Sequence, residues 1–210
     1  MFLKLSALVG VIVACAPIFL SWKARGWYAK LDSPAYSFND IPDLTGKIAI
    51  VTGGNSGIGL VTARELARKG AHVTIGTRSS SKGMEAKKEI CGALGTERPC
   101  NVDVLALDLA SLEKVAEFAD NFKQKHKTLD ILILNAAVMA CPFQLSADGY
   151  EMQFATNHLG HFLLTQLLLP LLDKSPDGRV VTVSSSAHRG APAEGIHFDA
   201  LNNDKDYSPL

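Results

Sequence analysis

A glycine-rich turn between an apolar strand and an amphipathic helix most constrains how this chain can fold. Residues 48–52 form a short β-rich run, and Gly53, Gly57 and Gly59 follow at positions 1, 5 and 7 of the turn. Gly53 permits a tight turn, Gly57 leaves room for a pyrophosphate, and Gly59 lets the next helix pack closely on a sheet. A glycine-rich hairpin without a ligand is the alternative, but the strand-to-helix context favours a dinucleotide site. The turn contains no Gly-Lys-Ser/Thr, which excludes an NTPase loop.

After this turn, short apolar runs alternate with longer amphipathic stretches. The alternation predicts βαβ units, and therefore an α/β fold of the Rossmann type with a doubly wound parallel sheet. Strands are expected at 48–52, 71–76, 102–107, 131–134 and within 178–184. Helices are expected from the turn to Gly70, at 81–94, after the capping residue Ser111, and at 150–172. The fifth strand is too apolar for an exposed edge, so the sheet is expected to be incomplete at its C-terminal side.

The N-terminal segment 5–22 carries no charged residue over eighteen positions. At ~1.5 Å per residue, a helix of this length spans ~27 Å, which is close to the hydrocarbon thickness of a bilayer. We therefore predict that residues 1–30 form a single-pass membrane anchor, a transmembrane helix. Basic residues at 23–30 place the rest of the chain in the cytosol, and the endoplasmic reticulum is the expected membrane. A cleaved signal peptide is the alternative, because residues 14–16 resemble a cleavage site.

Composition indicates where the domain begins and which partners are excluded. Residues 31–45 contain prolines and no sustained period, so they are expected to be a linker, followed by the Rossmann domain at 46–210. The 21 basic and 21 acidic residues give zero net charge, which argues against nucleic acid as a partner. The cysteines form no Cys-x-x-Cys pair, so reduced thiols are expected rather than disulfides or a zinc site. They are Cys15, Cys91, Cys100 and Cys141.

Several motifs occur in the order of a known family. The segment Thr52-Gly53-x-x-x-Gly57-Ile58-Gly59 resembles the cofactor motif of the short-chain dehydrogenases/reductases. The later matches are Asp108, Asn135-Ala136-Ala137, Asn157 and Val183-Ser184-Ser185. The similarity covers about residues 45–200. Within the family, residues 154–162 are similar to the retinol-dehydrogenase-like branch, whose members often carry an N-terminal anchor.

The resemblance implies a nicotinamide dinucleotide cofactor, and the end of the second strand indicates which one. An NAD site places a carboxylate there, whereas this strand ends in Thr77 and Arg78. Because Arg78 can bind a 2′-phosphate in a bidentate way, NADP(H) is favoured over NAD(H), with a solvated surface arginine as the alternative. Asp108 would accept from the adenine amino group and Asn135 would line the adenosine, although either could only cap a strand. The full set implied is Thr52, Gly53, Asn55, Ser56, Gly57, Ile58, Gly59, Thr77, Arg78, Asp108, Leu109, Asn135, Ala136 and Ala137.

The resemblance also implies the catalytic residues. Hydride transfer to a carbonyl leaves charge on oxygen, so the site needs a proton donor and hydrogen-bond donors. Ser185 would be one such donor, and Asn157 would help to hold a lysine through a water. The family takes its proton from a Tyr-x-x-x-Lys pair, but none of the four tyrosines here is followed by a lysine at that spacing. The chain is therefore expected to stop before this motif.

These residues predict an NADP(H)-dependent oxidoreductase that interconverts a carbonyl and an alcohol on a lipophilic, retinoid- or steroid-like substrate. The alternative is a nucleotide-binding product without catalysis, or an incomplete gene model that lacks the catalytic pair. His158 and His161 lie one helical turn apart, but helix packing explains them better than a metal, and no metal site is expected. Apolar residues nearly encircle the helix at 150–172. By resemblance this face would pair subunits in a homo-oligomer, while a missing partner helix would leave the same exposure.

Overall fold

The computed structural model describes residues 36–95, 99–190, 195–196, 198 and 201–207. The chain divides into two units, Met1–Asp43 and Leu44–Leu210. The described part of the first unit contains the 3-10 helix η2 (Phe38–Asp40), which a reciprocal capping box between Ser37 and Asp40 closes. The predicted membrane anchor at residues 1–30 lies outside the described residues. Among those that are described, no helix has the length and apolar character needed to cross a bilayer.

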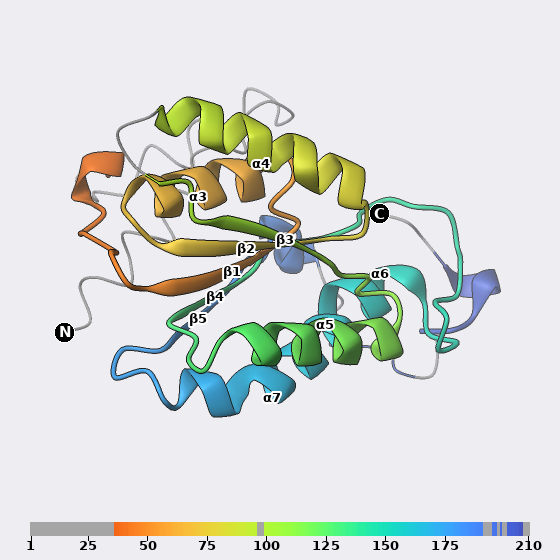
Figure 1. The fold of residues 1–210 in the computed structure, drawn as a ribbon. Coiled ribbons are helices and arrows are strands. Elements are labelled where there is room, and N and C mark those ends of the chain that lie inside the picture. Colours follow the sequence, from red (N-terminus) through yellow and green to blue (C-terminus); the bar gives the residue numbers. More distant parts are fainter. Residues whose placement is uncertain (1–35, 96–98, 191–194, 197, 199–200, 208–210) are drawn as a thin grey trace, which may run out of the picture. The chain divides into compact units, whose positions relative to one another are not determined.

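The second unit is built on a parallel five-stranded sheet (Figure 1). Its strands are β1 (Ile48–Thr52), β2 (His72–Thr77), β3 (Val102–Ala106), β4 (Ile131–Leu134) and β5 (Arg179–Thr182), in the order β3-β2-β1-β4-β5. Strand order reverses at β1, because the chain adds β2 and β3 on one side and then β4 and β5 on the other. The predicted Rossmann-type parallel sheet is therefore confirmed. The carboxyl ends of β1 and β4 meet at the reversal point, where such sheets bind ligands.

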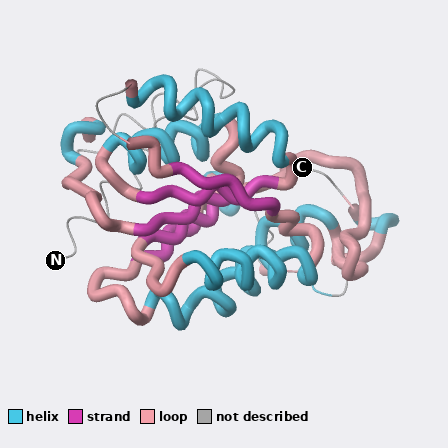
Figure 2. Tube along the Cα trace, viewed as in Figure 1, coloured by secondary structure: helices cyan, strands magenta, loops and turns pink. Residues whose placement is uncertain are grey.

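Helices cover both faces of this sheet. On one face lie α3 (Gly57–Arg68) and α4 (Ser80–Leu94), and on the other lie α5 (Leu112–Lys125) and α7 (Gly160–Leu172) (Figures 1 and 2). Ser111 caps α5 as expected, accepting from the Lys114 N–H. Strand β1 is buried along nearly its whole length, because both of its faces are covered. This explains why its sequence is continuously apolar rather than alternating.

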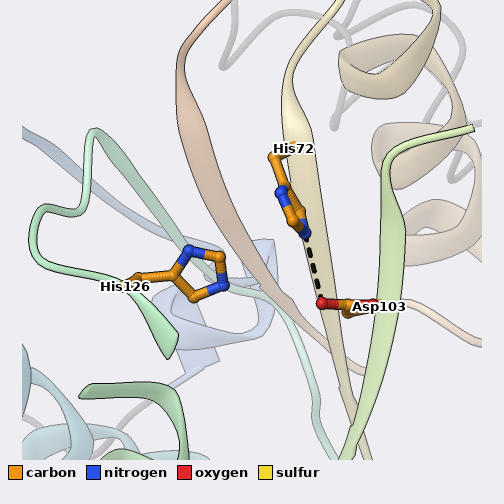
Figure 3. A group of neighbouring side chains, drawn as sticks. All are labelled: His72, Asp103 and His126. Atoms are coloured by element: carbon orange, nitrogen blue, oxygen red, sulfur yellow. Dashed lines mark hydrogen bonds and ion pairs between the residues drawn. The ribbon is translucent and has the colours of Figure 1, made fainter. Parts of the chain in front are cut away.

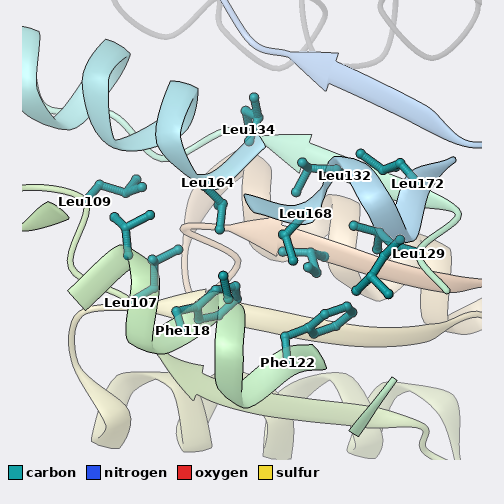
Figure 4. Packing of buried hydrophobic residues seen from close by; sticks show 14 residues of the cluster. Leu107, Leu109, Phe118, Phe122, Leu129, Leu132, Leu134, Leu164, Leu168 and Leu172 are labelled. Carbon is teal, nitrogen blue, oxygen red and sulfur yellow. The ribbon is translucent and has the colours of Figure 1, made fainter. Parts of the chain in front are cut away.

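The main hydrophobic core lies beneath α5 and α7 (Figure 4). Phe118 and Phe122 of α5, and Leu164 and Leu168 of α7, are no more than 1% exposed. Each pair is spaced four residues apart, so its members share one helix face. Truncating such a buried leucine or phenylalanine typically costs ~2–5 kcal/mol. This packing fixes α7, and with it His161, against the central strands.

The helix expected at 150–172 is correct in position but not continuous as an α-helix. It begins as α6 (Met152–Phe154), passes through the π-helical turn η3 (Ala155–Leu159), and continues as α7. Glu151 caps its start by accepting from the Gln153 and Phe154 N–H groups. A π turn inserts one extra residue and re-aims the side chains around it, often at functional sites. Asn157 lies within this turn.

Apolar side chains are exposed on α7 and β5. Phe162 is 58% exposed and Leu169 is 40% exposed, and Val180 of the edge strand β5 is 41% exposed. The sequence predicts this excess apolar face on the helix and an apolar fifth strand. Pairing of subunits through this face stays a prediction.

One expectation about the cysteines is wrong. Cys91 in α4 and Cys100, just before β3, form a disulfide with Cα atoms 5.3 Å apart. The two residues are separated by nine positions, a spacing without a recognisable pairing motif. They come together because α4 and β3 are packed side by side, which sequence spacing alone does not reveal. Cys141 is a free thiol, and Cys15 lies outside the described residues.

Candidate cofactor and active site

The glycine turn joins β1 to α3 as a preformed cradle. Gly53 donates its N–H to the Gly76 carbonyl of β2 at 2.8 Å, which ties the turn to the neighbouring strand. Gly57 adopts φ +52°, and a Cβ added there would meet no atom within 4 Å, so this position faces open space. Gly59 is the opposite case, since a Cβ there would collide with the Gly53 carbonyl oxygen and lie 2.6 Å from Asn135 Nδ2. Both glycines are required, one by conformation and one by close packing.

The start of α3 is suited to an anion. Ser56 occupies the N-cap with extended backbone, and its side chain makes no capping hydrogen bond. The first-turn N–H groups of α3, a helix of 12 residues, therefore keep their partial positive charge for a ligand. Together with the open position at Gly57, this arrangement fits the pyrophosphate of a dinucleotide. The residues predicted to contact it, Asn55 to Gly59, all lie on this turn and first helical turn.

Thr52 holds the two central strands and the long helix together at the reversal point. Its side chain is fully buried, and its Oγ1 accepts from the backbone N–H groups of Asn135, at 2.8 Å, and Ala136, at 3.0 Å. Asn135 returns a bond from Nδ2 to the Thr52 carbonyl at 3.0 Å. The amide of Asn135 therefore braces the turn from the end of β4. Ala137 follows on the surface.

The same hydroxyl fixes the protonation of His161. Thr52 Oγ1 already accepts two N–H bonds, so its single proton points to His161 Nε2, 2.9 Å away. His161 Nε2 is then the acceptor, and Nδ1 donates to the Asn157 carbonyl at 3.1 Å. Burial lowers the pKa of His161 below its ordinary value, in agreement with a neutral ring. His161 thus links β1 to the π turn.

A loss of stability in mild acid should follow from this buried neutral ring. A lowered folded-state pKa means that the unfolded chain takes up a proton first, so stability declines as the pH falls below about 6.5. His161→Gln keeps a polar side chain that cannot be protonated, and should cost about 1–3 kcal/mol at pH 8 through lost hydrogen bonds. Urea unfolding should show this gap to wild type narrowing at pH 5. A gap of equal size at both pH values would contradict the assignment.

Ser185 follows the carboxyl end of β5, and Asn157 is bonded to the loop that follows β4. Asn157 Oδ1 accepts from the Val138 N–H at 2.9 Å, and its Nδ2 donates to the Val138 carbonyl at 2.8 Å. The amide therefore clamps the loop after β4, and retains one lone pair and one proton for a further partner. Ser185 follows β5, is exposed, and accepts from the Ala187 N–H at 3.1 Å. Both residues therefore lie at the carboxyl end of the parallel strands, which is also where the cofactor turn lies.

The end of β2 offers a cation rather than an acid. Thr77 is buried, with its methyl group against Gly83 of α4, and Arg78 is the first exposed residue beyond the strand. Asp108 accepts from the Ala110 N–H at 3.0 Å, so one of its oxygens already closes the turn after β3. Leu109 is buried, and its carbonyl lies so close to Gly160 that no side chain fits there. Thr77 and Leu109 thus shape the site by packing.

Two features of the site are not predicted from the sequence. One is a surface hollow beside the turn, which Lys82 of α4 lines together with Asn55, Ser56 and the carboxylates Glu85 and Glu89. The second feature is the role of His161, for which the sequence predicts only helix packing. His158 instead stacks between Phe154 and Phe162, with ring centroids 5.3 and 6.3 Å away, and points to different partners from His161. Thr52 and His161 are 109 residues apart, so no local pattern could have paired them.

The fold and the turn together define a class of protein, the Rossmann-type dinucleotide-binding proteins. The family described as short chain dehydrogenase matches residues 47–200. The chain therefore belongs to the short-chain dehydrogenase/reductase family, in its retinol-dehydrogenase-like branch. The family is one of oxidoreductases that bind nicotinamide cofactors and act on small molecules, as the sequence motifs implied.

Individual relatives support this membership. Mouse retinol dehydrogenase 11 is 46% identical over 165 residues, which cover 79% of this chain and 50% of that protein. A solved structure of an uncharacterized protein from Mycobacterium paratuberculosis is 42% identical, with TM-score 0.69, over 84% of this chain and 59% of that one. A short chain dehydrogenase from Escherichia coli CFT073, complexed with NADPH, is 30% identical, with TM-score 0.60, over 71% and 63%. The chain spans about half the length of the curated relatives it matches.

Proposed function

We propose that this chain is the cofactor-binding part of an NADP(H)-dependent oxidoreductase that interconverts a carbonyl and an alcohol. The observation that carries the proposal is the cradle at the reversal point of the sheet, where the glycine turn and the uncapped start of α3 lie beside the end of β2, which Arg78 follows. The turn and α3 would hold the pyrophosphate. Arg78 would hold the 2′-phosphate, and Asp108 and Asn135 would line the adenosine.

NADP(H) is preferred over NAD(H) on grounds of charge. A buried threonine and an exposed arginine end β2, so no carboxylate stands there to repel a 2′-phosphate. The guanidinium can donate two parallel hydrogen bonds to phosphate oxygens. The relative from Escherichia coli that was solved with NADPH has the same overall fold and supports this choice.

The chemistry follows from groups on this chain. The nicotinamide, when bound, supplies or accepts the hydride. Ser185 would donate to the carbonyl oxygen as negative charge develops on it, and Asn157 would keep the loop after β4 in place beside the nicotinamide. The neutral His161, locked between Thr52 and the π turn, keeps Asn157 in register with β1. His161 is therefore a positioning residue.

The substrate proposed is lipophilic, of a retinoid- or steroid-like kind. The similarity to mouse retinol dehydrogenase 11 supports it, and the apolar segment at residues 5–22 supports anchoring in the endoplasmic reticulum membrane with the domain in the cytosol. The exposed apolar side chains of α7, Phe162 and Leu169, support pairing of two copies.

Removing the Arg78 guanidinium should reduce the preference for NADPH. We expect Arg78→Ala to weaken NADPH binding by about 10- to 100-fold, or ~1.5–3 kcal/mol, while NADH binding changes little. Titrations followed by cofactor fluorescence measure both affinities. Arg179→Ala is the matched control, because Arg179 is the first residue of β5 and lies at the amino end of the strands, away from the cofactor turn. This substitution should alter neither the NADPH affinity nor the NADH affinity. Identical curves for the two cofactors, before and after the substitution, would refute the proposed role.

A second candidate function is nucleotide binding without turnover. It is favoured by one feature, the lack of a Tyr-x-x-x-Lys pair in the 210 residues. Both candidates require the same cofactor cradle, so cofactor titration does not separate them. Turnover with an aldehyde substrate does.

A further inference from the structure

Three potential metal ligands meet at the end of the sheet opposite to the cofactor turn. His72 is the first residue of β2, Asp103 lies near the start of β3, and His126 follows the last turn of α5 (Figure 3). The glycine turn follows the carboxyl end of β1, so this cluster lies at the amino end of the parallel strands. None of the three residues takes part in the cofactor site.

The spacing of the ligand atoms suits one small cation. His72 Nε2 and Asp103 Oδ2 are 3.2 Å apart, and one ligand atom from each of the three residues lies within 4.8 Å of the others. A tetrahedral ion with bonds of about 2.0 Å separates its ligand atoms by about 3.3 Å. The first pair already has this separation. The side chains of His72 and Asp103 are 38% and 34% exposed, so they have room to close the remaining gap of about 1.5 Å to His126.

His126 gives independent evidence that a ligand belongs here. His126 is 92% buried, and its Nε2 has no hydrogen-bond partner among the residues that the structure describes. Figure 3 shows the ring directing a nitrogen toward Asp103. A buried polar atom left unsatisfied typically costs ~1–3 kcal/mol, so such atoms usually have a partner that completes them.

The environment of His126 keeps its lone pair available. The ring packs on Phe122 with centroids 4.6 Å apart, and the His72 ring meets it edge-on at 4.9 Å. Burial, and then the neighbouring His72, lower the pKa of His126, so its imidazole is neutral at physiological pH. A neutral imidazole is the form that ligates metals.

We propose that His72, Asp103 and His126 form a binding site for a divalent ion of the zinc class. Two imidazole nitrogens and one carboxylate oxygen suit such an ion, whereas magnesium and calcium prefer oxygen ligands alone. Water would complete the fourth position. Since the ligands come from β2, β3 and α5, the ion crosslinks one side of the sheet to the helix that covers it. Its role is to stabilise the fold, at a distance from the cofactor.

The proposed site differs from the expectation, drawn from the sequence, that the chain has no metal site. The earlier candidates, His158 and His161, are neighbours in sequence but face different partners. The proposed ligands include His72 and Asp103, 31 residues apart, and no short ligand motif contains them. Only the parallel register of β2 and β3 brings them together.

The test is metal binding by the full chain, prepared without a histidine tag and dialysed against a chelator. Addition of Zn²⁺ alone should give one bound ion per chain by calorimetry and a raised melting temperature. Co²⁺ should give the visible absorption of a tetrahedral site. Binding of NADPH should be the same with and without the ion, which separates this site from the cofactor site.

Variants decide which residues bind the ion. Asp103→Asn and His72→Gln preserve size and are expected to fold, and each should weaken Zn²⁺ binding at least about 100-fold, because even outer partners of metal ligands contribute 10–100-fold. His188→Gln, which changes an exposed histidine in the 3-10 helix η4 (Ser186–Gly190), should leave binding unchanged. The proposal is overturned if the wild-type chain binds no ion, or if its affinity survives both substitutions in the cluster.

Discussion

Replacing Gly59 with alanine should abolish measurable cofactor binding and destabilise the domain. The added Cβ would collide with the Gly53 carbonyl and lie 2.6 Å from Asn135 Nδ2, both of which are parts of the cradle. Neither neighbour is a flexible chain end, because Asn135 is bonded to Thr52 at 2.8 and 3.0 Å. Overpacking of this kind costs ~1–3 kcal/mol of stability. Displacing the turn removes several charge-assisted bonds to phosphate, so NADPH affinity should fall at least about 100-fold.

Gly92→Ala is the matched control for that substitution. Gly92 lies within α4, and a Cβ added there would meet no atom within 4 Å. Alanine favours a helix over glycine by about 0.8–1 kcal/mol, so this variant should be as stable as wild type or more so, with unchanged NADPH affinity. Chemical unfolding and cofactor titration of both variants separate the two cases. Normal NADPH binding by Gly59→Ala would show that the turn can move aside, and that the cradle is not rigid.

The strands and the phosphate turn could be predicted because their signals are local. The strand at 131–134 was expected at the bounds of β4, and the strand at 48–52 at those of β1. Each strand is a short apolar run followed by a residue type that favours turns. Because both faces of the sheet are covered, the run is apolar at successive positions rather than at alternate ones. The turn is equally local, since its three glycines fall within seven residues. The parallel direction of the strands followed from the βαβ pattern, whereas the order β3-β2-β1-β4-β5 comes from the structure.

The features that the sequence does not predict depend on contacts between distant residues. The Thr52–His161 bond, the disulfide and the His72–Asp103–His126 cluster all join separate elements. Each needs the register of the finished sheet before its members become neighbours. The π turn is a different case, because helical periodicity continues across it and one inserted residue leaves no compositional mark. Its consequence, the aim of Asn157 at Val138, therefore appears only in the structure.

The 210-residue polypeptide itself should bind NADPH but show no more than trace carbonyl reductase activity. Tyr207 cannot substitute for the family's acid, because its hydroxyl donates to the Cys141 carbonyl and accepts from Gln153 Nε2, both at 2.7 Å. Proton delivery to the carbonyl oxygen must then come from water. A positioned general acid typically contributes ~10²–10⁴-fold to the rate, and this factor should be lost. NADPH consumption with a long-chain aldehyde, measured against a cofactor-only blank, gives the rate.

Ser185 provides the discriminating control for this prediction. If turnover is only trace, Ser185→Ala should leave the rate at the level of the blank, and Ser184→Ala should do the same. Suppose instead that the polypeptide turns over rapidly, and that Ser185→Ala, but not Ser184→Ala, removes the activity. The proton would then have to come from a group of this chain near Ser185, and the dependence on a Tyr-x-x-x-Lys pair would be wrong. The two serines are adjacent and both exposed, so a difference between them would report on the site rather than on folding.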